Sequence, residues 1–261
     1  MIFNSIGYTI LEIPAYFFCA FTGFVVATSA FMILIVNKGY LLLPNLKGLM
    51  ISVGGLILTA RLFGCFSGVY RAIGIHEKVV FETIKNTGIV FYGGLLGMLA
   101  TYYLCLKSKV VSETDCYVLD VLAVTFPLFH TIARVGCFLS GCCYGKEMET
   151  WILVLYTVNI NGLPSTAYRI PVQLIEAGCN LVLFFYLLRL YSRKNWKDKH
   201  ILKRYLLIYS AERFVLEIIR GDSVRGVING VSFSQVISVI IFVCVITSIV
   251  KQRRISDGNS N

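Results

Sequence analysis

Four arginines lie within or beside long apolar segments, where a charged side chain is costly. They are Arg61, Arg134, Arg213 and Arg220. An arginine at the bilayer centre costs about 2.5–3.5 kcal/mol on insertion scales, so such residues mark ion pairs or functional sites. Arg213, Glu217 and Arg220 are spaced i, i+4, i+7, which predicts that they share one face of a helix.

These charges support two interpretations with different chemistry. In the first, Glu176, Glu217 and Asp222 pair with the arginines in a structural network between helices. In the second, two or three guanidiniums grip a phosphate through parallel N–H donors. We favour the phosphate site, because the arginines outnumber the nearby carboxylates. A lipid headgroup is the anion that this depth in a membrane would supply.

A second cluster of reactive residue types lies between residues 130 and 145. It contains His130, Cys137, Cys142 and Cys143. A His/Cys set can bind zinc, but the paired Cys-x-x-Cys spacing of most zinc sites is missing, so we expect no metal and no cofactor. A disulfide from Cys137 to one of the other two cysteines is an alternative, and so is a reactive, nucleophilic cysteine. The interpretation with the largest weight is that these small residues pack a tight helix end, with His130 hydrogen-bonded in the helix.

The chain that must position these residues is strongly apolar. Hydrophobic residues make up 57% of its 261 residues and charged residues 15%, with a mean hydropathy of +0.75. Soluble domains carry about 25% charged residues. We therefore predict an all-α membrane protein. Its net charge of +10 lies largely in loops between apolar stretches, which argues against a nucleic-acid partner.

Seven apolar stretches have about the 20-residue length that a bilayer requires. They predict one polytopic domain over residues 1–261, built as a seven-transmembrane-helix bundle. The long loop Lys146–Arg169 contains Trp151, Tyr156 and Tyr168, which suits a segment at the membrane interface. The predicted spans are Ile13–Val36, Leu46–Tyr70, Gly88–Leu106, Cys116–Val135, Val172–Tyr191, Ile201–Ile219 and Val231–Val250.

Lysine and arginine are distributed unevenly between the two sides of this predicted bundle. The loops after spans one, three, five and seven carry 14 of them, and the other side carries 6. Because positively charged loops stay in the cytoplasm, the N-terminus is predicted outside and the C-terminus in the cytoplasm. No lysine or arginine precedes Lys38, so we expect no cleavable signal peptide.

Five short motifs, taken in chain order, resemble those of one known family. Its motifs are His-Gly-Gly-Leu, Gly-Arg-(Ile/Val)-Gly-Asn-Phe-x-Asn-x-Glu-x-x-Gly, His-Pro-x-Gln-Leu-Tyr-Glu, Arg-Phe-x-x-Glu-x-x-Arg and Gln-x-x-Ser. The similar segments here are Tyr92–Leu95, Ala133–Gly145, Ile170–Glu176, Arg213–Arg220 and Gln235–Ser238. The chain thus resembles the prolipoprotein diacylglyceryl transferases, seven-span enzymes of the bacterial inner membrane.

Among the departures from the family's motifs, four replace polar residues close to the family's catalytic centre. Cys137, Ser140 and Cys142 stand where the signature has Asn, Asn and Glu, and Tyr92 stands where the family has His. Two alternatives therefore stay open. One is a related membrane lipid or acyl transferase that uses a cysteine of this cluster, and the other is a non-catalytic phospholipid-binding membrane protein.

The resemblance implies transfer of diacylglycerol from phosphatidylglycerol, or a similar anionic phospholipid, to the cysteine thiol of a lipoprotein precursor. The thiol must become a thiolate, and the leaving phosphate needs cations. The implied catalytic residues are Arg134, Arg213, Tyr92 and Glu217, with Glu176 as an alternative base. The implied headgroup site consists of Arg134, Arg213, Arg220, Gly93, Gly94, Gln173 and Glu176.

Overall fold

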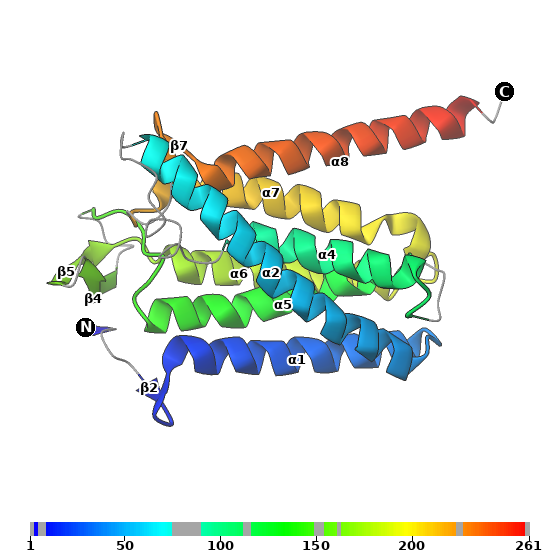
Figure 1. Ribbon diagram of the computed structural model, residues 1–261, viewed down its shortest axis with the longest axis horizontal. Helices are drawn as coiled ribbons and strands as arrows, with labels where there is room; N and C mark the ends of the chain where they lie inside the picture. The colour runs from blue at the N-terminus through cyan, green and yellow to red at the C-terminus, as the bar shows by residue number, and fades with distance from the viewer. Residues whose placement is uncertain are drawn as a thin grey trace.

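The protein is described here by a computed structural model that places residues 3–4, 9–74, 90–111, 116–148, 154–160, 163–222 and 227–258. Within these ranges the molecule is built from seven α-helices (Figure 1). They are α1 (Ala15–Asn37), α2 (Leu42–Gly74), α4 (Phe91–Lys107), α5 (Val118–Leu139), α6 (Val172–Tyr191), α7 (Ile201–Ile219) and α8 (Phe233–Gly258). Gly88 and Trp151 lie outside the described ranges, and so do Lys78, Lys85 and Arg225, which are three of the six positive residues counted on the predicted outer side.

Five of the described helices are long and apolar enough to cross a membrane, namely α1, α2, α5, α6 and α8. Large apolar side chains are exposed on the outer faces of these helices. Phe21 and Val182, for example, are each 70% exposed. Surfaces of this kind are found where lipid, and not water, surrounds the protein. The predicted class of all-α membrane protein is therefore confirmed.

Helix α5 is the centre of the bundle. Of the 18 consecutive residues that are most apolar in α5, 67% are buried. The same measure gives 22% for each of α1, α2 and α8. It packs against α1, α4, α6 and α7, while α2 crosses α4 diagonally on the outside (Figure 1). Polar groups that α5 turns inward are consequently shielded from the surroundings of the protein.

Helices α2 and α4 approach each other through glycines. A Cβ atom on Gly97 would lie 1.7 Å from Thr59 Oγ1, and one on Gly55 would lie 2.0 Å from Thr101 Oγ1. Gly93 likewise faces the Thr59 backbone of α2, where an added Cβ would lie 2.6 Å from the carbonyl oxygen. Close packing of membrane helices commonly depends on such small residues. This geometry supports a packing role for Gly93.

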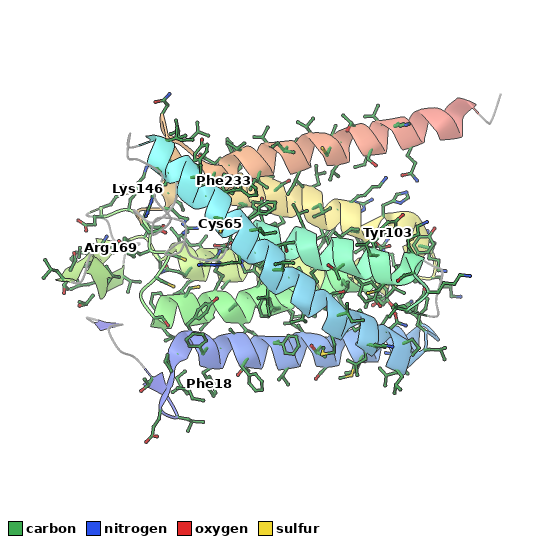
Figure 2. All side chains as sticks on the ribbon, in the orientation of Figure 1. Phe18, Cys65, Tyr103, Lys146, Arg169 and Phe233 are labelled. Atoms are coloured by element: carbon green, nitrogen blue, oxygen red, sulfur yellow. The ribbon has the colours of Figure 1, made fainter. Side chains whose placement is uncertain are left out.

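The structure adds short β-strands that the sequence did not lead us to expect. Strands β4 (Val154–Ile160) and β5 (Leu163–Arg169) form an antiparallel hairpin, and β1 (Phe3–Asn4) pairs with β4 in parallel. The hairpin lies at one end of the bundle, and Figure 2 shows Arg169 there, at the opposite end from Tyr103. The remaining short elements are β2 (Thr9–Ile10), β3 (Ile13–Pro14), the 3-10 helix η1 (Trp196–Lys199), β6 (Val227–Ile228) and β7 (Val231–Ser232).

Candidate functional site

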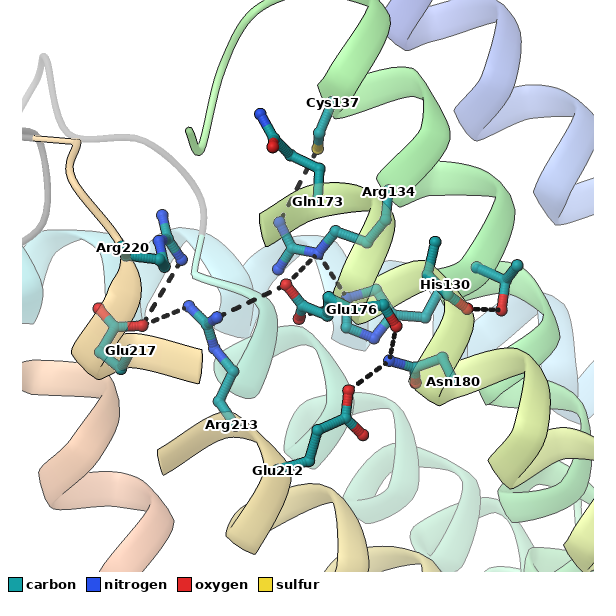
Figure 3. Close-up of polar contacts among 12 residues, drawn as sticks. His130, Arg134, Cys137, Gln173, Glu176, Asn180, Glu212, Arg213, Glu217 and Arg220 are labelled. Carbon is teal, nitrogen blue, oxygen red and sulfur yellow. Dashed lines mark hydrogen bonds and ion pairs between the residues drawn. The ribbon is translucent and has the colours of Figure 1, made fainter. Parts of the chain in front are cut away.

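The carboxylate of Glu176 on α6 is the meeting point of two arginines from other helices. Its Oε2 atom lies 2.9 Å from Arg134 Nε of α5 and 3.6 Å from Arg213 Nη1 of α7. All three side chains are buried, and Figure 3 shows them pointing toward one another. Arg134 and Arg213 are 42 and 37 positions away from Glu176 in the sequence. They reach the same carboxylate oxygen because the C-terminal half of α5, the first turns of α6 and the C-terminal half of α7 meet at one end of the bundle.

The network continues along α7 and ends just beyond it. Arg213 Nη2 lies 2.8 Å from Glu217 Oε2, which is 3.6 Å from Arg220 Nη1. Arg220 in turn donates two hydrogen bonds to Asp222, at 2.9 and 2.7 Å. The prediction of a shared helix face is confirmed for Arg213 and Glu217, whereas Arg220 follows the last residue of α7 in extended backbone and still reaches Glu217.

The charges of this network alternate in sign along its length. The order is Arg134, Glu176, Arg213, Glu217, Arg220, Asp222. Our expectation that arginines outnumber the nearby carboxylates was wrong for this network, which has three of each. Near neutrality is what burial requires, since an unpaired charge away from water is very costly.

One arginine donor in the network is left without a hydrogen bond. Arg213 Nη1 is buried, and its 3.6 Å contact with Glu176 Oε2 is too long for a hydrogen bond. Unsatisfied buried polar atoms are rare in proteins, and one explanation for them is a ligand that completes the site.

His130 belongs to this network and not to the cysteines. Arg134 Nε donates to His130 Nε2 at 3.0 Å, and the imidazole stacks on Phe91 with ring centroids 3.9 Å apart. Because Nε2 accepts this bond, the ring proton is assigned to Nδ1. The interpretation of His130 as a hydrogen-bonded helix residue is confirmed, and the alternative of a His/Cys zinc set has no support in its position.

Asn180 and Glu212 complete the surroundings of Glu176, and the sequence analysis missed both. Asn180 Nδ2 donates to the Glu176 backbone oxygen at 2.9 Å and to Glu212 Oε1 at 3.2 Å. The signal that could have found Asn180 is its i+4 spacing from Glu176 on α6.

Tyr92 is placed apart from the ion pairs. Its hydroxyl lies 2.7 Å from Ser238 Oγ on α8, and Ser238 Oγ itself donates to the Ser234 backbone oxygen at 2.9 Å. Tyr92 is therefore the donor in this pair. The contact joins two of the five motifs, Tyr92–Leu95 and Gln235–Ser238.

The three cysteines Cys137, Cys142 and Cys143, which we call the thiol triad, gather at the end of α5. Their Sγ atoms all lie within 4.8 Å of one another, and all nine cysteines of the chain are free thiols. Arg134 Nη1 approaches Cys137 Sγ at 3.9 Å, so the triad adjoins the charge network (Figure 3).

The loop that carries the triad is fixed to both α6 and α7. Gln173 Nε2 donates to the Cys142 backbone oxygen at 2.7 Å. Gly221 N donates to the Tyr144 backbone oxygen at 3.0 Å, and a Cβ on Gly221 would lie 2.6 Å from the Gly145 oxygen. The triad loop and the end of α7 are thus held in backbone contact.

Tyr144 packs its ring against the guanidinium of Arg169, whose carbon lies 4.7 Å from the ring centroid. Arg169 also forms an ion pair with Glu147. Burial raises the pKa of the Tyr144 hydroxyl above its ordinary value, which already keeps a phenol protonated at neutral pH. These contacts anchor strand β5 beside the loop that carries the triad.

Apolar helices that enclose a charge network at one end define a multi-pass membrane protein with a buried polar site. Residues 4–251 match the family model described as prolipoprotein diacylglyceryl transferase. The chain belongs to this family, as its motifs predicted.

Curated relatives carry the same family name. The phosphatidylglycerol–prolipoprotein diacylglyceryl transferase of Clostridium tetani is 35% identical over 164 residues, which are 63% of this chain and 64% of that one. A second such protein, from Clostridium perfringens, is 28% identical over 89% of this chain and 88% of its own length. The Streptococcus equi subsp. zooepidemicus protein is 32% identical over 69% of this chain and 68% of its own. The similarity to the Clostridium tetani relative thus spans slightly under two thirds of that protein.

Proposed function

We propose that this chain is a membrane enzyme that transfers a diacylglyceryl group from phosphatidylglycerol to the cysteine thiol of a lipoprotein precursor. In this reaction the sulfur–carbon bond forms, the carbon–oxygen bond to the phosphate breaks, and glycerol phosphate leaves. The thiol proton must pass to a base, because the thiolate is the nucleophile. Family membership and the names of the relatives support both substrates.

The observation that carries this proposal is the shared carboxylate oxygen between Arg134 and Arg213. Glu176 Oε2 occupies the position between two guanidiniums, one of which has a donor without a hydrogen bond. A phosphate oxygen has the same charge and acceptor chemistry as that carboxylate oxygen. In the proposed enzyme Arg134 and Arg213 hold the departing phosphate, and Glu176 keeps them in position beforehand.

Other residues have supporting roles in this proposal. Arg220 is engaged by Asp222 through two hydrogen bonds, which suits a secondary contribution to the positive potential. Gln173 positions the loop that carries the triad, and Gly93 and Gly94 pack α4 against α2. Glu217 is the candidate base, with Glu176 as the alternative. Tyr92 donates a hydrogen bond to Ser238, so a role as base requires the loss of the phenol proton and of that bond.

The experiment that tests the function is complementation. We expect this chain to restore lipidation of a tagged lipoprotein precursor in bacteria depleted of their own transferase. The Arg134→Lys variant is the matched control and is expected to fail. Cells that make correctly inserted protein and still accumulate unmodified precursor would contradict the proposal. Phospholipid binding by the purified chain without turnover would instead favour the non-catalytic phospholipid-binding alternative.

We further propose seven spans in one domain of the bacterial cell membrane, with the N-terminus outside and the C-terminus in the cytoplasm. Helix α4 has 17 residues, and α7 has 19 that include Glu212, Arg213 and Glu217. The ion pair of Arg213 and Glu217 is turned inward, so the lower apolarity of α7 reflects the site that it carries. A helix of 17 residues is about 26 Å long, close to the bilayer core of about 30 Å.

Reporter fusions test this orientation. Fusions after Arg193 and after Lys251 are both expected to score as cytoplasmic, because 14 of the lysines and arginines lie on that side in the proposed arrangement. A fusion after Arg71 is the control and is expected to score as external. An external signal from the fusion after Lys251 would rule out the seven-span arrangement.

A further inference from the structure

We propose that the thiol triad of Cys137, Cys142 and Cys143 is a binding site for a soft divalent metal ion, of which Zn²⁺ is the physiological representative and Cd²⁺ a convenient probe. The site is built by the end of α5 and the loop that follows it. This inference does not depend on the proposed lipid transfer.

Helix termination brings the triad together. Gly141, with φ +65°, ends α5 in the left-handed conformation that glycine adopts at low cost. Gly141 N then bonds to the Phe138 oxygen, and Cys142 N bonds to the Cys137 oxygen, which is the Schellman pattern of helix ends. This turn folds Cys142 back over Cys137.

Cys143 completes the triad through an unusual backbone conformation. Its φ is +57°, which few residues other than glycine adopt and which costs energy for a side chain with a Cβ. Such strain persists where the surrounding structure holds it, and functional sites are where it is concentrated. Here the holding contacts are the Gln173 bond to the Cys142 oxygen and the Gly221 bond to the Tyr144 oxygen.

The spacing of the three sulfurs fits one tetrahedral ion. With a zinc–sulfur bond of about 2.3 Å, tetrahedral geometry sets the sulfurs about 3.8 Å apart. The observed Sγ atoms already lie within 4.8 Å of one another, so small side-chain rotations suffice. The fourth position would be open to water or another ligand. Cys142 is exposed and Cys143 partly so, which gives an ion a way in.

The charge around the triad also suits a thiolate site. Three thiols that bind one divalent ion release three protons and leave a net charge of about −1 on the complex. The guanidinium of Arg134, 3.9 Å from Cys137 Sγ, can compensate that charge. Sulfur ligands select soft ions, whereas Mg²⁺ and Ca²⁺ prefer oxygen.

The test is a titration of the purified, reduced full-length chain with Cd²⁺, monitored by thiolate-to-metal charge-transfer absorption. We expect one ion per chain, competition by Zn²⁺ and no effect of Mg²⁺. Single Cys→Ser changes in the triad are each expected to weaken binding about tenfold or more, and the triple variant to abolish it. The control replaces the exposed Cys116, Cys179 and Cys244 by serine and is expected to keep full binding.

A second measurement uses the unaltered chain, so it does not depend on how variants fold. Bound Cd²⁺ is expected to protect Cys142 from maleimide, while labelling of Cys116 stays unchanged. The proposal is overturned if the reduced chain binds no Cd²⁺, if binding persists in a folded triple variant, or if Cys142 reacts equally with and without the ion. If the triad reacts with maleimide only after reduction, and the reduced chain then binds no metal, the triad forms a disulfide and is not a metal site.

Discussion

Arg134→Lys and Arg213→Lys are each expected to lower turnover of phosphatidylglycerol about 10²–10³-fold, a loss of about 2.7–4 kcal/mol of transition-state stabilisation. The change keeps the positive charge but removes the planar fork of donors that matches two phosphate oxygens. Both arginines contact the same Glu176 oxygen, so neither can replace the other's geometry. Arg220→Lys is expected to cost less, because Asp222 engages Arg220.

The measurement is turnover of labelled phosphatidylglycerol by purified protein in detergent, with a lipoprotein signal peptide as acceptor. Thermal stability of each variant shows whether it is folded. Arg189→Lys, on the exposed face of α6, is the matched control and should keep wild-type turnover. If Arg134→Lys and Arg213→Lys are folded and keep full turnover, the phosphate site is wrong and the arginines belong to a purely structural network.

Glu176→Gln is expected to destabilise the folded protein by about 3–5 kcal/mol, the usual cost of removing one partner from a buried ion pair. The loss is large because one carboxylate oxygen serves two arginines, and both would lose a counter-charge inside the bundle. The thermal midpoint in detergent, or the fraction folded in denaturant, measures the effect.

A half-exposed ion pair is the control for this measurement. Glu147 is 57% exposed and pairs with one buried arginine, Arg169, so Glu147→Gln is expected to cost less than Glu176→Gln, which takes the counter-charge from two buried arginines. The double variant Glu176→Gln with Arg134→Gln should recover part of the lost stability. If Glu176→Gln costs no more than Glu147→Gln, contact with a second arginine adds nothing to the contribution of Glu176 to folding.

Local patterns in the sequence predicted the helices closely. Spans Val172–Tyr191 and Ile201–Ile219 coincide with α6 and α7, since each lies between polar segments that end the apolar run. The second span was predicted as Leu46–Tyr70, but α2 covers Leu42–Gly74. Pro44 falls in its first turn, where backbone N–H groups have no helical partner, so the proline does not delay the helix.

Contacts between distant parts of the chain were beyond sequence reasoning. The i, i+4 spacing of Arg213 and Glu217 on α7 predicted their shared face correctly, because that relation is local. No local rule places Glu176 between Arg134 and Arg213, or Tyr92 against Ser238. The thiol triad likewise depends on the left-handed turn at Gly141 that ends α5. The residue type alone does not predict that turn, because glycine also occurs in other backbone conformations.

The order of the network along the chain bears on how the protein enters the membrane during synthesis. α5 carries Arg134 and α6 carries Glu176, so both precede the charged face of α7 on the ribosome. An emerging α7 would be a poor candidate for insertion by itself, because Arg213 and Glu217 would meet lipid. The earlier helices offer it a polar docking face. The residues that hold the finished site would therefore also assist assembly, because α7 would insert stably only after α5 and α6 have paired.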